Sequence, residues 1–315
     1  MASGTGQLDQ IIATTFEKVR PVLADNITTQ NALLAALNSK SRVTEDGGRV
    51  IRKPVLFDFN DTVGSYDGYD PIDTTPQGGI GFAEYEWKQY AGSVTISGKE
   101  ERLNSGAPQI IALLQAKMEQ LRVSTEQDMN AMLWGDGTGN GGKDFLGVPA
   151  IVADSGILGG IDPATEAFWK ALKVSTADIT AVAGVKKLNS VLNSLRIVKS
   201  KPDFEFTEQA SFEAYEALAT PNIRFEDLKM ADLGFDVVAH KGAEVMFEPE
   251  VGSGKWYFIN SQYLEFITHA DAWLKMLDFV RPVNQDAKSA LVVSMGNLVT
   301  DVRRAHGYIN TVTNA

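Results

Sequence analysis

The glycine-rich run from Gly137 to Gly142 is the segment of this sequence whose spacing comes closest to a phosphate-binding motif. Its spaced glycines match a dinucleotide-binding pattern, and with Lys143 they match a phosphate loop up to its lysine. The next residue is Asp144, where that loop needs a hydroxyl to hold magnesium. Both motifs need a strand before the glycines and a helix after them, whereas here a helical pattern precedes and an apolar extended segment follows. We therefore interpret the run as a helix stop and wide turn, with nucleotide binding as the alternative.

The other candidates for catalysis or metal binding are few and far apart. His240, His269 and His306 do not stand at metal-ligand spacing. The chain has neither a His-Glu-x-x-His run nor a glycine-serine elbow. It has no cysteine, which excludes disulfides, thiolate metal sites and cysteine nucleophiles. The sequence indicates no catalytic residue, no cofactor and no metal. An enzyme with a site assembled from distant residues stays open as an alternative.

Charge is unevenly distributed along the 315 residues. The formal net charge is −11, of which residues 1–54 carry +2 and the remainder −13. A body this acidic repels a polyanion, so sequence-specific binding of duplex DNA is not expected. No apolar run is long enough to span a membrane, and the first residues do not have the pattern of a signal peptide.

An acidic segment and a basic pair are the remaining charged features. The acidic segment lacks the register of a calcium loop, and we interpret it as solvating or as pairing with a basic patch on another subunit. Its aspartates are Asp67, Asp70 and Asp73. Arg303 and Arg304 are the candidate patch, and the alternative is a basic pair that is simply exposed.

Residues 49–104 have the periodicity of a long two-stranded hairpin. Apolar residues alternate with polar ones around Phe57 and again around Tyr85. Val94 and Ile96 continue on the opposite parity, which predicts a bulge near Gly92. The segment between the two limbs is rich in glycine, proline and aspartate. Such a hairpin is marginal alone in water, so its aromatics need either their own domain or another molecule to lie on.

The rest of the chain mixes helices and strands without regular alternation, which predicts an α+β fold. Residues 7–20 and a short helix with Leu33, Leu34 and Leu37 read as a detachable N-terminal segment. The strongest helical pattern runs from about residue 105 to Trp134, and others cover 176–198 and 208–218. Strands are expected in the regions 235–238, 245–247, 256–259, 264–266, 273–280 and 291–300.

The order of these elements resembles the major capsid protein of tailed bacteriophages, the Hong Kong 97-like fold. The most specific match is Leu133-Trp134-Gly135-Asp136-Gly137-Thr138-Gly139, followed by Phe145-Leu146-Gly147-Val148 and Ile151-Val152. A second match is Gly234-Phe235-Asp236-Val237-Val238 with the later Gly254-Lys255-Trp256-Tyr257-Phe258-Ile259-Asn260. The C-terminal Arg303-Arg304-Ala305-His306-Gly307-Tyr308-Ile309 is also similar in type. These matches follow the family's order over nearly the whole chain.

The resemblance implies an α+β capsid fold with five parts. These are an N-arm at 1–48, an E-loop hairpin at 49–104, a peripheral domain with a long spine helix at 105–169, an axial domain at 170–270, and a return to the peripheral sheet at 271–315. It also implies that the E-loop and N-arm contact neighbouring copies. The expected E-loop contacts are Phe57, Phe59, Tyr66, Tyr69, Asp70, Ile80, Phe82, Tyr85 and Trp87, and the expected N-arm contacts are Ile11, Ile12 and Phe16.

The function implied by the resemblance is a structural, non-enzymatic one. Copies of the chain would form pentamers and hexamers of an icosahedral head, assembled in the host bacterial cytoplasm, that encloses double-stranded DNA and contacts it non-specifically. The expected partners are a portal, possible decoration proteins and a separate scaffolding protein, since only about 48 residues precede the hairpin. The hairpin has no lysine between Pro54 and Trp87, so a shell without covalent cross-links is expected. The alternative is an encapsulin shell enclosing a cargo enzyme.

Overall fold

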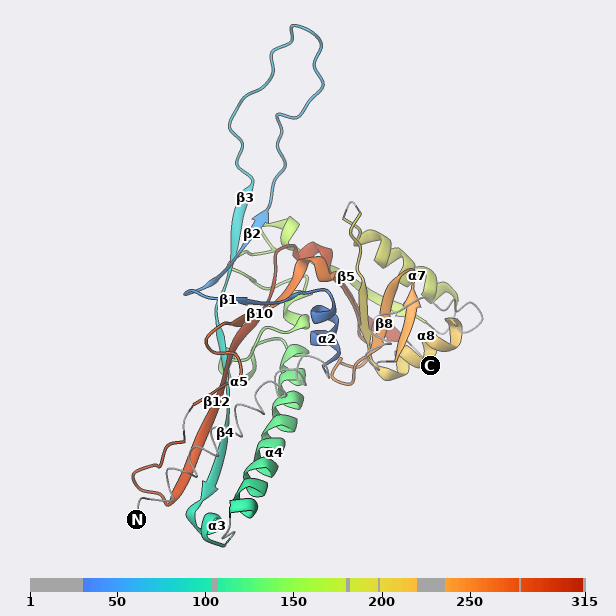
Figure 1. The fold of residues 1–315 in the computed structure, drawn as a ribbon. Helices are drawn as coiled ribbons and strands as arrows, with labels where there is room; N and C mark the ends of the chain where they lie inside the picture. Colours follow the sequence, from blue (N-terminus) through green and yellow to red (C-terminus); the bar gives the residue numbers. More distant parts are fainter. Residues whose placement is uncertain are drawn as a thin grey trace.

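In the described residues the fold mixes helices with three β-sheets, which confirms the predicted α+β class (Figure 1). The computed structural model of the chain describes residues 31–103, 107–179, 182–197, 199–219, 236–277 and 279–313. The segment 7–20, including Ile11, Ile12 and Phe16, lies outside the described residues.

A five-stranded sheet and one long helix form an elongated arm (Figure 1). Its central strand is β12 (Ala287–Thr300), which pairs antiparallel with β4 (Lys88–Ser97), β10 (Leu264–His269) and β11 (Lys275–Met276). β1 (Val43–Asp46) pairs parallel with β10. The helix α4 (Ala107–Leu133) lies along β4 and is roughly 40 Å long at 1.5 Å per residue. The strand expected at 273–280 is reduced to the two residues of β11 and an isolated bridge at Val280.

A six-stranded sheet builds a second lobe, covered by the helices α7 (Val182–Ser194) and α8 (Gln209–Ala219). Its strand order is β5 (Leu172–Asp178), β13 (Gly307–Thr313), β9 (Trp256–Ile259), β6 (Phe204–Thr207), β8 (Ala243–Phe247) and β7 (Val237–His240). The helix expected from residue 176 is therefore wrong at its start, because β5 pairs with β13 until Asp178. After β12 in the five-stranded sheet, the C-terminal strand β13 pairs with β5 and β9 in this lobe. Pairing partners about 135 residues apart decide both points, and local periodicity does not contain them.

The predicted hairpin is confirmed at its base and is shorter than its pattern suggested. β2 (Ile51–Leu56) pairs with β3 (Ile80–Tyr85), and β4 then leaves β2 to pair with β12. The bulge expected near Gly92 is wrong, because β4 and β12 pair in one uninterrupted register. The change of parity falls instead at Glu86 and Trp87, where the chain passes from one sheet to the next. A Cβ on Gly92 would lie 2.5 Å from Leu121 Cδ1, so this glycine allows α4 to approach the sheet.

The short helix α2 (Ala32–Ser39) corrects the interpretation of this region as a detachable segment. Asn31 caps it by accepting a hydrogen bond of 2.9 Å from the Leu34 amide. All residues from Ala32 to Leu37 are buried in the main core. Residues 31–46 are thus an integral part of the body.

The C-terminal end of α4 and the segments that follow it connect the two lobes. Trp134, just beyond α4, makes an edge contact of 5.1 Å between ring centroids with Phe206 of β6. The sequence 135–147 forms the predicted wide turn, in which a Cβ on Gly147 would lie 2.1 Å from the Gly135 oxygen. The remaining short helices are α3 (Gly98–Leu103), α5 (Gly139–Gly142), α6 (Val148–Ile151), η1 (Ala167–Trp169), η3 (Ser261–Tyr263) and η4 (Arg303–Ala305). One main core and one smaller core under α7 and α8 result.

Candidate functional site

The loop between β2 and β3, residues 57–79, projects away from the body and has no regular structure (Figure 1). Its aromatic side chains lie in solvent: Phe59 is 72% exposed and Tyr66 is 64% exposed. The loop also carries five aspartates and no lysine or arginine. Large exposed apolar groups on a soluble protein typically mark a surface that contacts another molecule. The loop does not fold back on its own domain, which was the alternative left open by the sequence.

The sequence-predicted contact residues separate into exposed and buried ones. The side chains of Phe57, Phe59, Tyr66, Tyr69, Asp70, Ile80 and Phe82 are exposed. Tyr85 is only 2% exposed, so its prediction as a contact with a neighbour is wrong. Trp87 is half-buried, stacks edge-on against His269 and donates a hydrogen bond of 3.0 Å to the Gly48 oxygen. Both residues hold the loop base to its own chain.

An apolar groove lies at the foot of the loop. Phe57 approaches Phe168 with ring centroids 6.1 Å apart, and Phe82 lines the same hollow of about 430 Å³. Ile80 and Phe82 on β3 point outward because the alternate residues of that strand, Ala83 and Tyr85, face the core. The strand periodicity thus exposes both side chains, and Phe82 lines the groove.

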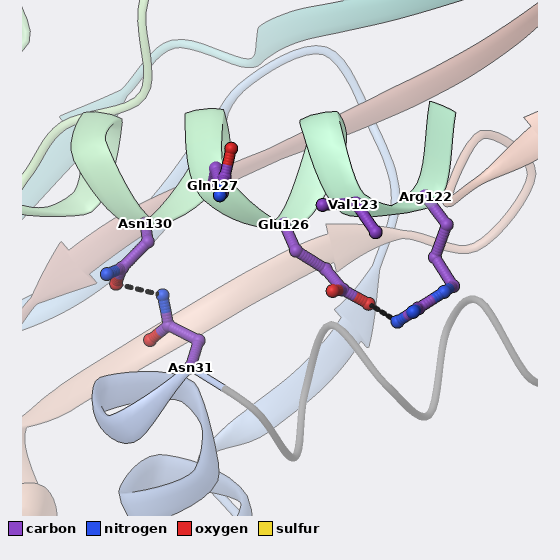
Figure 2. A pocket seen from close by; sticks show the side chains of 6 residues that line it. All are labelled: Asn31, Arg122, Val123, Glu126, Gln127 and Asn130. Atoms are coloured by element: carbon purple, nitrogen blue, oxygen red, sulfur yellow. Dashed lines mark hydrogen bonds and ion pairs between the residues drawn. The ribbon is translucent and has the colours of Figure 1, made fainter. Parts of the chain in front are cut away.

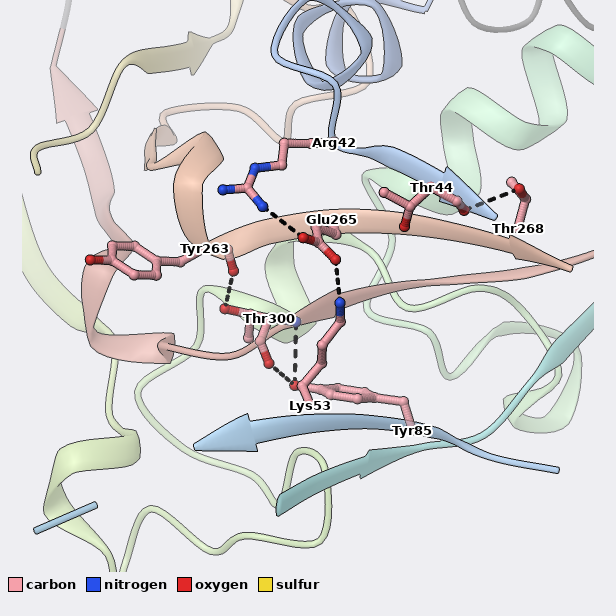
Figure 3. A network of polar contacts seen from close by, with 8 residues as sticks. All are labelled: Arg42, Thr44, Lys53, Tyr85, Tyr263, Glu265, Thr268 and Thr300. Atoms are coloured by element: carbon pink, nitrogen blue, oxygen red, sulfur yellow. Dashed lines mark hydrogen bonds and ion pairs between the residues drawn. The ribbon is translucent and has the colours of Figure 1, made fainter. Parts of the chain in front are cut away.

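A polar network fixes the loop base to β10 and β12 (Figure 3). Glu265 on β10 forms an ion pair with Arg42 at 2.7 Å and a second ion pair with Lys53 on β2. Tyr85 on β3 donates a hydrogen bond of 2.6 Å to the Thr300 oxygen. The sequence did not reveal this network, because Lys53 and Glu265 stand 212 residues apart. The loop therefore projects from a fixed base.

His306 extends the network behind Thr300. The Asn260 amide donates to its Nδ1 at 3.3 Å, and its Nε2 lies 3.2 Å from the Thr300 hydroxyl, which in turn donates to the Tyr263 oxygen at 2.7 Å. These partners fit a neutral imidazole with its proton on Nε2. Complete burial lowers the pKa of His306 to about 4. Both ring nitrogens of this histidine are thus occupied by hydrogen bonds within the core.

Arg303 is buried, which corrects its interpretation as part of a basic patch. It is 1% exposed, and its guanidinium donates to the oxygens of Ile151 at 2.9 Å, Gly156 at 2.9 Å, and Ala150 and Ser155 at 3.0 Å. Burial lowers its pKa. The five N–H groups of arginine suit such a cluster of carbonyls, including those at the end of α6. Only Arg304 remains exposed.

A second hollow, of about 320 Å³, lies beside α4 and is shown in Figure 2. Asn31 donates to Asn130 on α4, and Asn130 donates to Glu248 at 2.8 Å. Burial raises the pKa of Glu248. On the same helix face, Arg122 pairs with Glu126 at 2.6 Å. These residues join the cap of α2, the helix α4 and the segment after β8 in the second lobe.

The structure supports none of the motif-based alternatives in the described residues. Asp136 accepts hydrogen bonds from the amide and hydroxyl of Thr138, which closes the glycine turn on itself. Within the described ranges, no group of three His, Asp or Glu side chains is arranged to hold a metal ion. In the same part of the chain, no helix has the length and apolarity needed to cross a bilayer.

Comparisons with known proteins identify the fold. No family model and no curated protein matches the sequence. The capsid protein of cyanophage A-1(L) has a similar structure, with a TM-score of 0.66 at 15% identity over 87% of this chain and 90% of that chain. The capsid of a native GTA particle is also similar, with a TM-score of 0.57 at 10% identity over 88% of this chain and 90% of that chain. The encapsulin SrpI of Synechococcus elongatus has a TM-score of 0.55 at 11% identity over 89% of this chain and 88% of that chain. The chain therefore has the fold of phage capsid proteins, which the encapsulin shares.

Proposed function

We propose that this chain is the major capsid protein of a tailed bacteriophage, a structural subunit that assembles with copies of itself into a closed shell. The observation that carries the proposal is the exposed loop 57–79, in which Phe59, Tyr66 and Tyr69 find no covering surface in the described part of the chain. A shell subunit gives them one, because a neighbouring copy covers what the monomer exposes. The fold, which is that of phage capsid proteins, supports this function.

In this proposal the parts of the chain have distinct roles. The loop and its strands are the E-loop, α4 is the spine of the peripheral domain, and the lobe with α7 and α8 is the axial domain that gathers at five-fold and quasi-six-fold axes. The network around Glu265 keeps the loop base fixed. A fixed base lowers the entropy cost when the loop docks on its neighbour.

The shell encloses double-stranded DNA in this proposal and is found in the virion after assembly in the host cytoplasm. A portal and a scaffolding protein are the further partners that the family resemblance suggests. The second candidate is an encapsulin shell around a cargo enzyme, which the likeness to the Synechococcus encapsulin favours. No catalytic role is proposed for any residue.

The deciding experiment is electron microscopy of particles purified after expression, combined with detection of nucleic acid and of co-purifying proteins. Closed icosahedral particles support the shell function. Particles from infected cells that hold DNA identify a phage head, whereas particles that hold one enzyme identify an encapsulin. A chain that stays monomeric at high concentration, with or without co-expressed scaffold, contradicts both.

A further inference from the structure

The second lobe carries a cationic groove beside the start of β5. The groove has a volume of about 430 Å³ and is lined by three exposed cations, Lys170, Arg196 and Arg304. They come from the segment before β5, the end of α7 and η4, so three separate parts of the chain converge there. None of the three makes an ion pair or a side-chain hydrogen bond with another described residue.

The sequence around Arg196 is unusual for a chain with a net charge of −11. Residues 179–202 contain five lysines or arginines and no aspartate or glutamate. Leu172, Leu195 and Ile197 also line the groove, so it has an apolar wall as well as the three cations. An apolar wall lowers the local dielectric constant and strengthens the attraction of the groove for negative charge. The groove thus fits an acidic partner that also offers apolar surface.

The exposed loop has this chemistry. Residues 57–79 contain five aspartates and no lysine or arginine to balance their charge. Near its end, Tyr66, Asp67, Tyr69 and Asp70 alternate aromatic and acidic groups around a turn in which the Asp70 amide donates to the Asp67 oxygen at 3.0 Å. The carboxylates can pair with the three cations of the groove, while a tyrosine ring lies against its apolar side chains or over a guanidinium.

We propose that the acidic loop tip of one copy docks in the cationic groove of a neighbouring copy. This inference rests on the proposed shell function and names the surface on which the loop lies. Every copy supplies one tip and one groove, so the contact is head-to-tail and generates a ring when the rotation closes. Duplex DNA is the other polyanion that such a groove could attract, but the net charge of −11 on the whole chain repels a long polyanion more than it repels a short acidic loop.

The test is a charge exchange in the full-length chain. Asp61→Lys with Asp67→Lys reverses the charge of the loop at two exposed carboxylates, one in the tip and one before it, for which no described residue is a hydrogen-bond partner. Arg196→Glu with Arg304→Glu reverses the groove by the same number of charges. Each pair alone should lower the yield of closed particles about tenfold or more, because like charges then face each other. All four substitutions together should restore assembly. Lys186→Glu with Lys187→Glu, on the exposed face of α7, is the matched control and should assemble as the wild type does.

The outcomes separate this contact from the shell function itself. If the wild type forms particles and the fourfold variant assembles no better than either pair, the proposed contact is wrong while the shell function stands. If the groove variant assembles normally but retains less linear duplex DNA in a gel-shift assay, the groove binds nucleic acid and the inference is overturned. If the wild type itself never assembles, the shell function fails and this inference fails with it.

Discussion

The phenol of Tyr85 donates a hydrogen bond of 2.6 Å to the backbone oxygen of Thr300. The two residues belong to different sheets, β3 of the hairpin and β12 of the five-stranded sheet. The bond is buried, and it ties the base of the exposed loop to the longest strand of the body. Burial raises the pKa of the Tyr85 phenol far above its usual value, so this group stays a donor at physiological pH.

Removing this hydrogen bond should weaken the body. Tyr85→Phe leaves the buried Thr300 oxygen without its donor, which costs about 1–2 kcal/mol of the free energy of unfolding. Urea denaturation measures the loss, and hydrogen exchange should become faster in β3. Tyr66→Phe makes the same chemical change on the exposed loop and should alter the unfolding free energy by less than about 0.5 kcal/mol. Equal effects of the two substitutions would contradict the anchoring role of Tyr85.

Shortening the loop should separate folding from assembly. The Phe57 amide donates to the Gly79 oxygen at 2.9 Å, so an Asn-Gly turn in place of residues 58–78 can close the hairpin there. We expect unchanged thermal unfolding of the monomer and no closed particles by electron microscopy. A variant with the loop replaced by glycine and serine at equal length tests whether side chains or chain length matter. Normal shells from the short variant would show that the loop is not needed.

Arg303 should be essential for stability although it carries no proposed contact. Arg303→Met leaves the oxygens of Ala150, Ile151, Ser155 and Gly156 without their donors. The expected loss is roughly 3 kcal/mol or more of unfolding free energy. Arg304→Met, at the exposed neighbouring position, is the matched control and should leave monomer stability unchanged. A difference of less than about 1 kcal/mol between these variants would argue against the carbonyl cluster.

Acidification should destabilise the chain through His306. Burial holds its pKa near 4, below the ordinary value of 6.5, so the unfolded chain binds more protons between these two pH values. Stability therefore decreases as the pH falls from 6.5 to 4, by on the order of 3 kcal/mol from this group. Buried carboxyls with raised pKa values, Glu248 and Asp301, oppose the trend at its acid end.

Urea unfolding at a series of pH values measures this dependence. His306→Gln lacks the titrating imidazole and should show a flatter profile between pH 6.5 and 4, whatever its absolute stability. A wild-type chain that is as stable at pH 5 as at pH 7, or a variant with an unchanged slope, would contradict the role of His306.

Assembled particles should contain no covalent bonds between subunits. The loop has no lysine, and Lys53 at its base is occupied by the ion pair with Glu265. Boiling in detergent should release a single band at the mass of one chain. A ladder of fused oligomers would contradict this prediction.

The sequence by itself determined the local elements of this protein. Strand alternation located the hairpin base, helical periodicity located α4, and the cluster of glycines located the turn after it, because each depends on neighbours along the chain. The absence of cysteine and the wide spacing of the histidines argued against the common catalytic and metal sites. The order of the elements along the chain, through its resemblance to the capsid family, was enough to indicate the fold.

Tertiary structure alone decided which side chains of these elements are free to act. Tyr85 and Phe82 lie on one strand, yet only the pairing with the body shows that Tyr85 is buried and Phe82 exposed. Arg303 and Arg304 are adjacent and chemically equal, but one caps carbonyls about 150 residues away and the other lines a groove. The short helix with Leu33, Leu34 and Leu37 has the pattern of a detachable arm, yet as α2 it lies inside the core. Burial is a sum over contacts between distant residues, and such contacts leave no periodic signal in the sequence.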